Sequence, residues 1–146
     1  MSSVPKLGNN RYLATSKGVN RMLNQLNGIL AADNITVQNV TANASNVVNI
    51  TLANGNFVNI TLPASGTYTF YITDLIKGQF YLLIKQPAAG NAILQTGTNP
   101  ITCLGTYYRG NGFSPSLSTG GSALDMLTFT GDGLNYYHNL TLKLLS

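Results

Sequence analysis

The chain has 146 residues, about one domain's worth and enough to bury a hydrophobic core. Only 8% of the residues are charged, there is no Glu, and eight Lys and Arg against four Asp give a formal net charge of +4. A single His, a single Cys and four carboxylates exclude an internal disulfide framework and argue against a zinc cage or a catalytic carboxylate pair.

The net positive charge lies in an N-terminal arm. Residues 1–32 contain four basic side chains and no acidic one, whereas positive and negative charges cancel over residues 33–146. Such an arm can bind an acidic surface on a protein or a nucleic acid. We expect docking on another protein, because four charges with only Tyr12 as an aromatic neighbour are few for a nucleic-acid site. The expected anchoring residues are Lys6, Arg11, Lys17 and Arg21.

One amphipathic helix is predicted near the end of this arm, beginning after Thr15 or Ser16 and reaching Leu30. Its apolar residues recur at spacings of three and four, which places them on one stripe. A lone helix of about 15 residues is marginal in water, so the stripe has to be covered. Two partners remain open: the chain's own domain, or copies of the helix from other chains. The residues of an oligomer seam would be Val19, Met22, Leu26 and Ile29.

From Asp33 onward apolar and polar residues alternate with a period of two, which predicts strands. We expect two parts in the chain: residues 1–32 as the arm with its helix, and residues 33–146 as an antiparallel β-sandwich or jelly-roll-like module. Asn54-Gly55 predicts a β-hairpin between its flanking strands. Residues 79–86 are nearly all apolar, which favours a central strand covered on both faces. Residues 105–122 contain five Gly and one Pro and are expected to form an extended loop.

The phrase Asn-Ile-Thr recurs at residues 34–36, 49–51 and 59–61. A chain rich in Asn, Thr and aliphatic residues produces so short a phrase by chance. We therefore predict no solenoid from it.

Catalytic and metal-binding chemistry is not predicted. His138 lies within a strand pattern without an acidic neighbour, so we expect a rim histidine and not a catalytic base. Asp132 is explained by an Asp-Gly turn, whereas Asp125 has no evident structural role. Cys103 lies in an apolar run and is expected to be buried. We expect no enzyme activity, no cofactor and no metal.

Aromatic residues are the remaining candidates for a binding surface. A cluster in the Gly-rich region combines three rings with a guanidinium, a combination that can grip a sugar or a protein. The alternative, which we favour, is that the rings fill the end of the sandwich or a seam between subunits, since large rings usually find a core. The candidate residues are Tyr107, Tyr108, Arg109 and Phe113.

The C-terminal two-thirds resembles β-modules of bacteriophage head-decoration, head-fibre and tail-fibre proteins. The stretches that carry the resemblance are Gly78–Gln86, Gly90-Asn91, Ser114–Ser118, Leu124–Phe129 and Asp132–Tyr137. The resemblance implies a trimeric virion appendage without catalytic residues. The long repetitive shaft of a tail fibre is missing, so a short capsid-decorating protein or head fibre suits the length better.

We therefore expect a virion structural protein, assembled in the host cytoplasm and attached through its arm to a capsid or tail protein. Its partners would be copies of itself in a homotrimer, the particle and, through the outer face of the module, the host surface. The alternative is a carbohydrate-binding or receptor-binding module of a tail fibre. No stretch is long and apolar enough to predict a membrane span, and no secretory signal peptide is expected.

Overall fold

The computed structural model describes residues 19–20, 35–95, 100–110 and 116–144. The chain divides into two compact units, residues 1–35 and residues 36–146. In the first unit, Val19 and Asn20 have helical backbone, and the side chain of Val19 is 47% exposed. The other expected seam residues, Met22, Leu26 and Ile29, lie outside the described residues.

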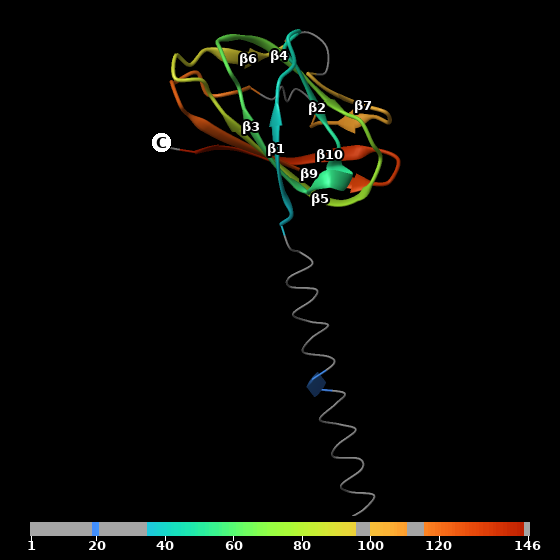
Figure 1. Ribbon diagram of the computed structural model, residues 1–146. Coiled ribbons are helices and arrows are strands. Elements are labelled where there is room, and N and C mark those ends of the chain that lie inside the picture. The colour runs from blue at the N-terminus through green and yellow to red at the C-terminus, as the bar shows by residue number, and fades with distance from the viewer. Residues whose placement is uncertain (1–18, 21–34, 96–99, 111–115, 145–146) are drawn as a thin grey trace, which may run out of the picture. The chain divides into compact units, whose positions relative to one another are not determined.

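The second unit, which we call the β-module, is built from strands, and the prediction of a mostly-β fold is confirmed (Figure 1). One short 3-10 helix, η1 (Leu52–Asn54), interrupts them. The strands are β1 (Val37–Thr41), β2 (Val47–Ile50), β3 (Phe57–Thr61), β4 (Gly66–Ile72), β5 (Lys77–Lys85), β6 (Ala92–Leu94), β7 (Ile101–Cys103), β8 (Tyr107–Tyr108), β9 (Leu124–Asp132) and β10 (Tyr136–Leu144).

The chain passes back and forth between two sheets as it runs from β1 to β6. The first sheet has the order β1-β3-β5-β9-β10-β8, and the second has β2-β4-β6 with β7 also paired to β4. Consecutive strands of one sheet in this part are parallel, as in β1–β3, β3–β5 and β2–β4. The expected antiparallel arrangement is therefore wrong for this half. Here the chain winds around the core and adds parallel strands to each sheet in turn.

The hairpin predicted at Asn54-Gly55 does not form. β2 and β3 flank this dipeptide but belong to different sheets, and η1 carries the chain across between them. Gly55 is needed for another reason, because a Cβ there would lie 2.6 Å from the carbonyl oxygen of Thr36. Pairing of β3 with β1 and β5 overrides the local preference of Asn-Gly for a hairpin turn.

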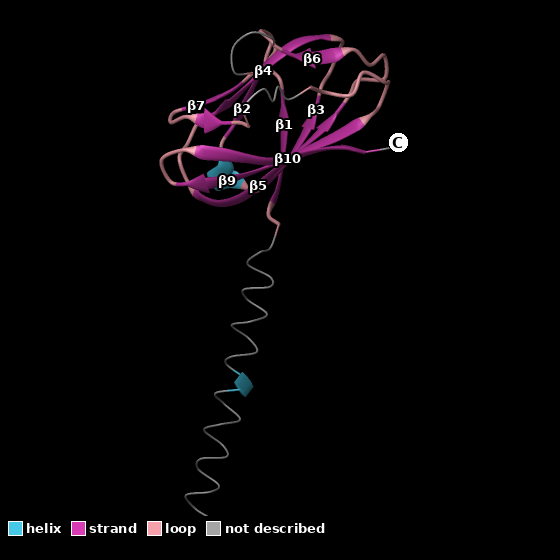
Figure 2. Cartoon of the chain, turned by 180° about the vertical axis from the view of Figure 1, so that it is seen from behind, coloured by secondary structure: helices cyan, strands magenta, loops and turns pink. Residues whose placement is uncertain are grey.

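The second half of the first sheet is antiparallel. β9 lies between β5 and β10 and pairs antiparallel with both, and the three strands lie next to one another in Figure 2. The register shifts in β10 between His138 and Leu140. β8 adds a two-residue parallel pairing to β10. It lies inside the region expected to be an extended loop. β5 is central, as predicted, but its burial alternates, so only one of its faces is fully covered.

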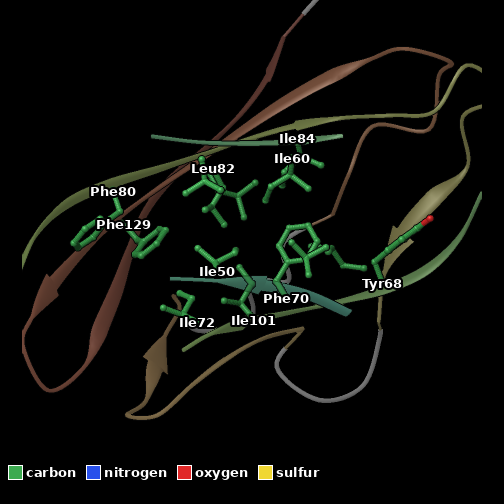
Figure 3. Packing of buried hydrophobic residues seen from close by; sticks show 14 of the residues in the cluster. Ile50, Ile60, Tyr68, Phe70, Ile72, Phe80, Leu82, Ile84, Ile101 and Phe129 are labelled. Carbon is green, nitrogen blue, oxygen red and sulfur yellow. The ribbon is translucent and has the colours of Figure 1, made fainter. Parts of the chain in front are cut away.

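The core lies between the two sheets. Period-two alternation directs one set of side chains inward on β4, β5 and β9, such as Phe80, Leu82 and Ile84 on β5. Each fully buried side chain of this kind contributes about 1.5–3 kcal/mol. In Figure 3 the first sheet supplies Ile60, Leu82 and Ile84, and the second sheet supplies Ile50, Phe70, Ile72 and Ile101.

Candidate functional site

The carboxylate of Asp74 has a structural position. It follows β4 and accepts hydrogen bonds from two backbone N–H groups of η1, from Leu52 at 2.9 Å and from Ala53 at 2.8 Å. These donors are at the start of a short helix and have no partner within it. Asp74 thereby holds the crossing between the two sheets.

Asp125, which had no evident role in the sequence, is fully buried on β9. Its two oxygens accept hydrogen bonds from the N–H of Ser118 at 2.7 Å and from the hydroxyl of the same residue at 2.8 Å. A buried carboxylate is tolerated when its oxygens are hydrogen-bonded in this way. Asp125 therefore fastens the segment before β9 to the sheet.

His138 and Tyr107 form a second polar pair at the margin of the core. The hydroxyl of Tyr107 lies 2.8 Å from Nδ1 of His138, and Nε2 of His138 lies 2.9 Å from the hydroxyl of Thr141. Loss of water around the half-buried imidazole lowers the pKa of His138, and burial raises the pKa of Tyr107. Tyr107 is 4% exposed and packs edge-on against Phe129, so it belongs to the core and not to a surface.

Cys103 is half-buried on β7 and packs against the core, and its burial raises the pKa of the thiol. Within the described part of the chain, no group of three or more His, Cys or Asp side chains is placed to hold a metal ion. None of the helices in that part is long and apolar enough to cross a membrane.

Within the described residues of the β-module, two exposed aromatic residues lie together, Tyr108 and Tyr137. They are cross-strand partners on β8 and β10, and their rings stack with centroids 5.3 Å apart and planes inclined by 8°. Their exposed fractions are 50% and 40%. We call this pair, together with Asp132, the tyrosine platform.

Hydrogen bonds hold the platform in place. The hydroxyl of Tyr137 donates to Oδ2 of Asp132 at 2.9 Å, while Oδ1 accepts the N–H groups of Leu134 and Asn135 at 2.8 and 2.7 Å. These backbone donors, with that of Asn135 first, lower the pKa of Asp132, and the bond to the carboxylate raises the pKa of Tyr137. Asp132 thus has the expected turn role and also orients an exposed ring.

Apolar and charged side chains lie in the segments that carry the platform. Leu104 precedes β8 and is 61% exposed, and Leu134 follows Asp132 and is 69% exposed. The two segments touch, because a Cβ on Gly105 would collide with the carbonyl oxygen of Leu134. Arg109, directly after Tyr108, is also exposed.

The expected surface cluster is thus divided: Tyr107 is core, Tyr108 and Arg109 are exposed, and Phe113 lies outside the described residues. Tyr137 and Asp132 were not among the candidate surface residues predicted from the sequence. The available signal was alternation along the last strand, because two adjacent tyrosines must face opposite sides of a sheet. In the structure Tyr136 is buried and Tyr137 faces outward. The anchoring residues Lys6, Arg11, Lys17 and Arg21 also lie outside the described residues.

Comparisons with protein-family models, with curated proteins and with solved structures find no match for this chain. The candidate site therefore rests on its own geometry. A stacked, exposed pair of rings beside a carboxylate can stack on the apolar face of a ligand and hydrogen-bond its polar groups.

Proposed function

We propose that this protein is a structural component of a virus particle, a capsid-decorating or head-fibre protein whose N-terminal arm attaches it and whose β-module projects from the particle. The observation that carries the proposal is the division of the chain. The described core of the β-module is built from residues 48–136, so the module can fold around its own core while the arm serves attachment.

The distribution of charge supports an attachment role for the arm. The net charge of +4 equals the charge of residues 1–32, and positive and negative charges cancel over residues 33–146. A concentrated positive charge is attracted to an acidic patch on a capsid or tail protein and speeds the encounter. Assembly as a homotrimer, with Val19, Met22, Leu26 and Ile29 at the seam, would multiply these weak contacts into firm attachment.

The positions of the described carboxylates favour a structural or binding module over an enzyme. Asp74, Asp125 and Asp132 each hold backbone N–H groups of turns or segment ends. A general base has to be free to exchange protons with a substrate. Carboxylates that accept several backbone hydrogen bonds serve rigidity instead.

The test compares two full-length variants of equal net charge. In one, Lys6, Arg11, Lys17 and Arg21 are changed to Gln; in the other, the four exposed cations of the β-module, Lys77, Lys85, Arg109 and Lys143, are changed to Gln. Both variants lose four positive charges. We expect only the first to be depleted from purified virus particles. Equal incorporation of the two variants would refute anchoring by the arm.

A second candidate function is recognition of a host-surface glycan, and the tyrosine platform favours it. Aromatic rings held rigidly at a surface can stack on a sugar ring with little loss of side-chain entropy. Tyr108→Ala is expected to abolish retention of the protein on host-derived glycan without shifting the melting temperature. Leu134→Ala, an exposed apolar change close by, is the control. Unchanged retention in Tyr108→Ala would exclude the platform as the glycan site.

A further inference from the structure

Among the described residues, the strand β1 forms one edge of the six-stranded sheet and pairs with β3 alone. The pairing is parallel and continuous over five residues, from Val37 opposite Phe57 to Thr41 opposite Thr61. Side chains on β1 alternate between exposed and half-buried positions, and those of Val37, Asn39 and Thr41 are exposed. The pairing is therefore regular, and in the described part of the chain no strand lies on the outer side of β1.

The hydrogen bonds with β3 show which backbone groups of β1 face outward. The N–H of Phe57 donates to the carbonyl oxygen of Thr36 at 3.1 Å. In a parallel pair, alternate residues direct both N–H and C=O toward the same neighbour. Residues 36, 38 and 40 accordingly face β3, and the N–H and C=O groups of Val37, Asn39 and Thr41 point away from the sheet.

Features that normally protect an edge from pairing are missing from β1. Edge strands are usually interrupted by charged residues, proline or a bulge. β1 contains none of these, and residues 34–73 as a whole carry no charged side chain. The open part of β10, by contrast, has Lys143 and a register irregularity between His138 and Leu140. The open edge of β1 is thus the less protected of the two.

We propose that β1 pairs antiparallel with β1 of a second copy of this chain, around a two-fold axis at Asn39. This arrangement brings each outward-facing residue opposite another: Asn39 opposite its counterpart, and Val37 opposite Thr41. Each of these pairs exchanges two backbone hydrogen bonds. The two cores stay on the same side of the joined sheet, and β1 itself contributes no charged side chain to the contact.

The side chains suit the same partner. Across β1 and β3 the neighbours are alike, with Asn39 beside Asn59 and Thr41 beside Thr61, and the amide of Asn59 donates to that of Asn39 at 3.2 Å. A second β1 continues this row of amides. The contact goes beyond the proposed function: a two-fold edge contact cannot close a trimer, so in a trimeric appendage it would join chains of two trimers.

Cross-linking of the full chain tests the geometry. Two variants are compared, Asn39→Cys and Asn59→Cys, each combined with Cys103→Ser. Both remove the hydrogen bond between the two side-chain amides, and they place a thiol on β1 and on β3, respectively. Across the proposed axis the Cα atoms of residue 39 are about 5.5 Å apart, and those of residue 59 are three strand spacings, about 14 Å, apart. A bismaleimide reagent too short for the longer distance should give a covalent dimer with Asn39→Cys alone.

A charge placed at the edge tests the association itself. Asn39→Lys brings two ammonium groups together at the axis, whereas Asn59→Lys places the same charge one strand away. Light scattering should show that the mass of the folded full chain is halved by Asn39→Lys and unchanged by Asn59→Lys. Equal masses for wild type and Asn39→Lys, or equal cross-linking of the two Cys variants, would overturn the edge contact. Neither result depends on incorporation into particles, which tests the arm.

Discussion

The two halves of the six-stranded sheet are stabilised by different means. In the parallel half, β1, β3 and β5 align residues of similar kind, so Val40, Ile60 and Ile84 lie in one row. In the antiparallel half, the rings of Phe80, Phe129 and Tyr136 interlock, with centroid distances of 5.5–5.9 Å. A row of similar residues on parallel strands can be continued by a further strand. Three rings that pack against one another offer no such repeat. The open edge of the sheet accordingly lies on the repetitive side.

The antiparallel half should be the more sensitive to substitution, and Phe129→Ala should have the largest effect. Phe129 is fully buried and contacts three aromatic rings. Its truncation should lower the free energy of unfolding by about 3–5 kcal/mol. Urea denaturation measures this, with the exposed Leu134→Ala as a control expected within about 0.5 kcal/mol of wild type. A loss below about 1 kcal/mol would mean that the ring cluster is not closely packed.

Asp125→Ala should have the next largest effect, because it leaves the N–H of Ser118 without its acceptor beside the core. We expect a loss of about 2–3 kcal/mol, since hydrogen bonds to charged groups are among the stronger ones. Ser118→Ala removes only the hydroxyl donor and should cost about 1 kcal/mol. Equal losses in the two variants would show that the backbone bond contributes little.

The antiparallel half should also respond to pH through His138. Burial lowers the pKa of this imidazole below its ordinary value of 6.5, so the unfolded chain binds a proton more readily than the folded one. At higher pH the imidazole is neutral in both the folded and the unfolded state, so its protonation does not affect stability. As the pH falls through about 6.5, stability is lost until the folded pKa is passed. Melting temperatures between pH 7.5 and 5.5 should fall less in His138→Gln than in wild type.

The parallel half should tolerate loss of its amide row. Asn59→Ala removes an exposed side-chain hydrogen bond to Asn39 and should lower the free energy of unfolding by about 0.2–1 kcal/mol. The double variant Asn39→Ala/Asn59→Ala should lose little more than one single variant, because the two residues share the bond. Fully additive losses in urea denaturation would show that the amides act separately.

Local alternation from Asp33 onward predicted that this part of the chain is built from strands. The strand expected at residues 79–86 lies centrally as β5, and the Asp132 turn forms as predicted. The hairpin at Asn54-Gly55 was wrong because a turn preference of local origin competes with strand pairing over long distances. The structural role of Asp125 could not be predicted, since its partner Ser118 lies in a segment without a regular pattern.

Sequence by itself determined the mostly-β class, the location of the net positive charge in the arm and the scarcity of His, Cys and carboxylate side chains, because composition and period-two alternation are local properties. Only the tertiary structure decided that the strands run parallel in one half, that Tyr107 is buried while Tyr108 stacks on Tyr137, and that β1 is an edge. The physical reason is that alternation specifies which face of a strand is buried. Strand direction and neighbours are decided by contacts between residues far apart in the chain.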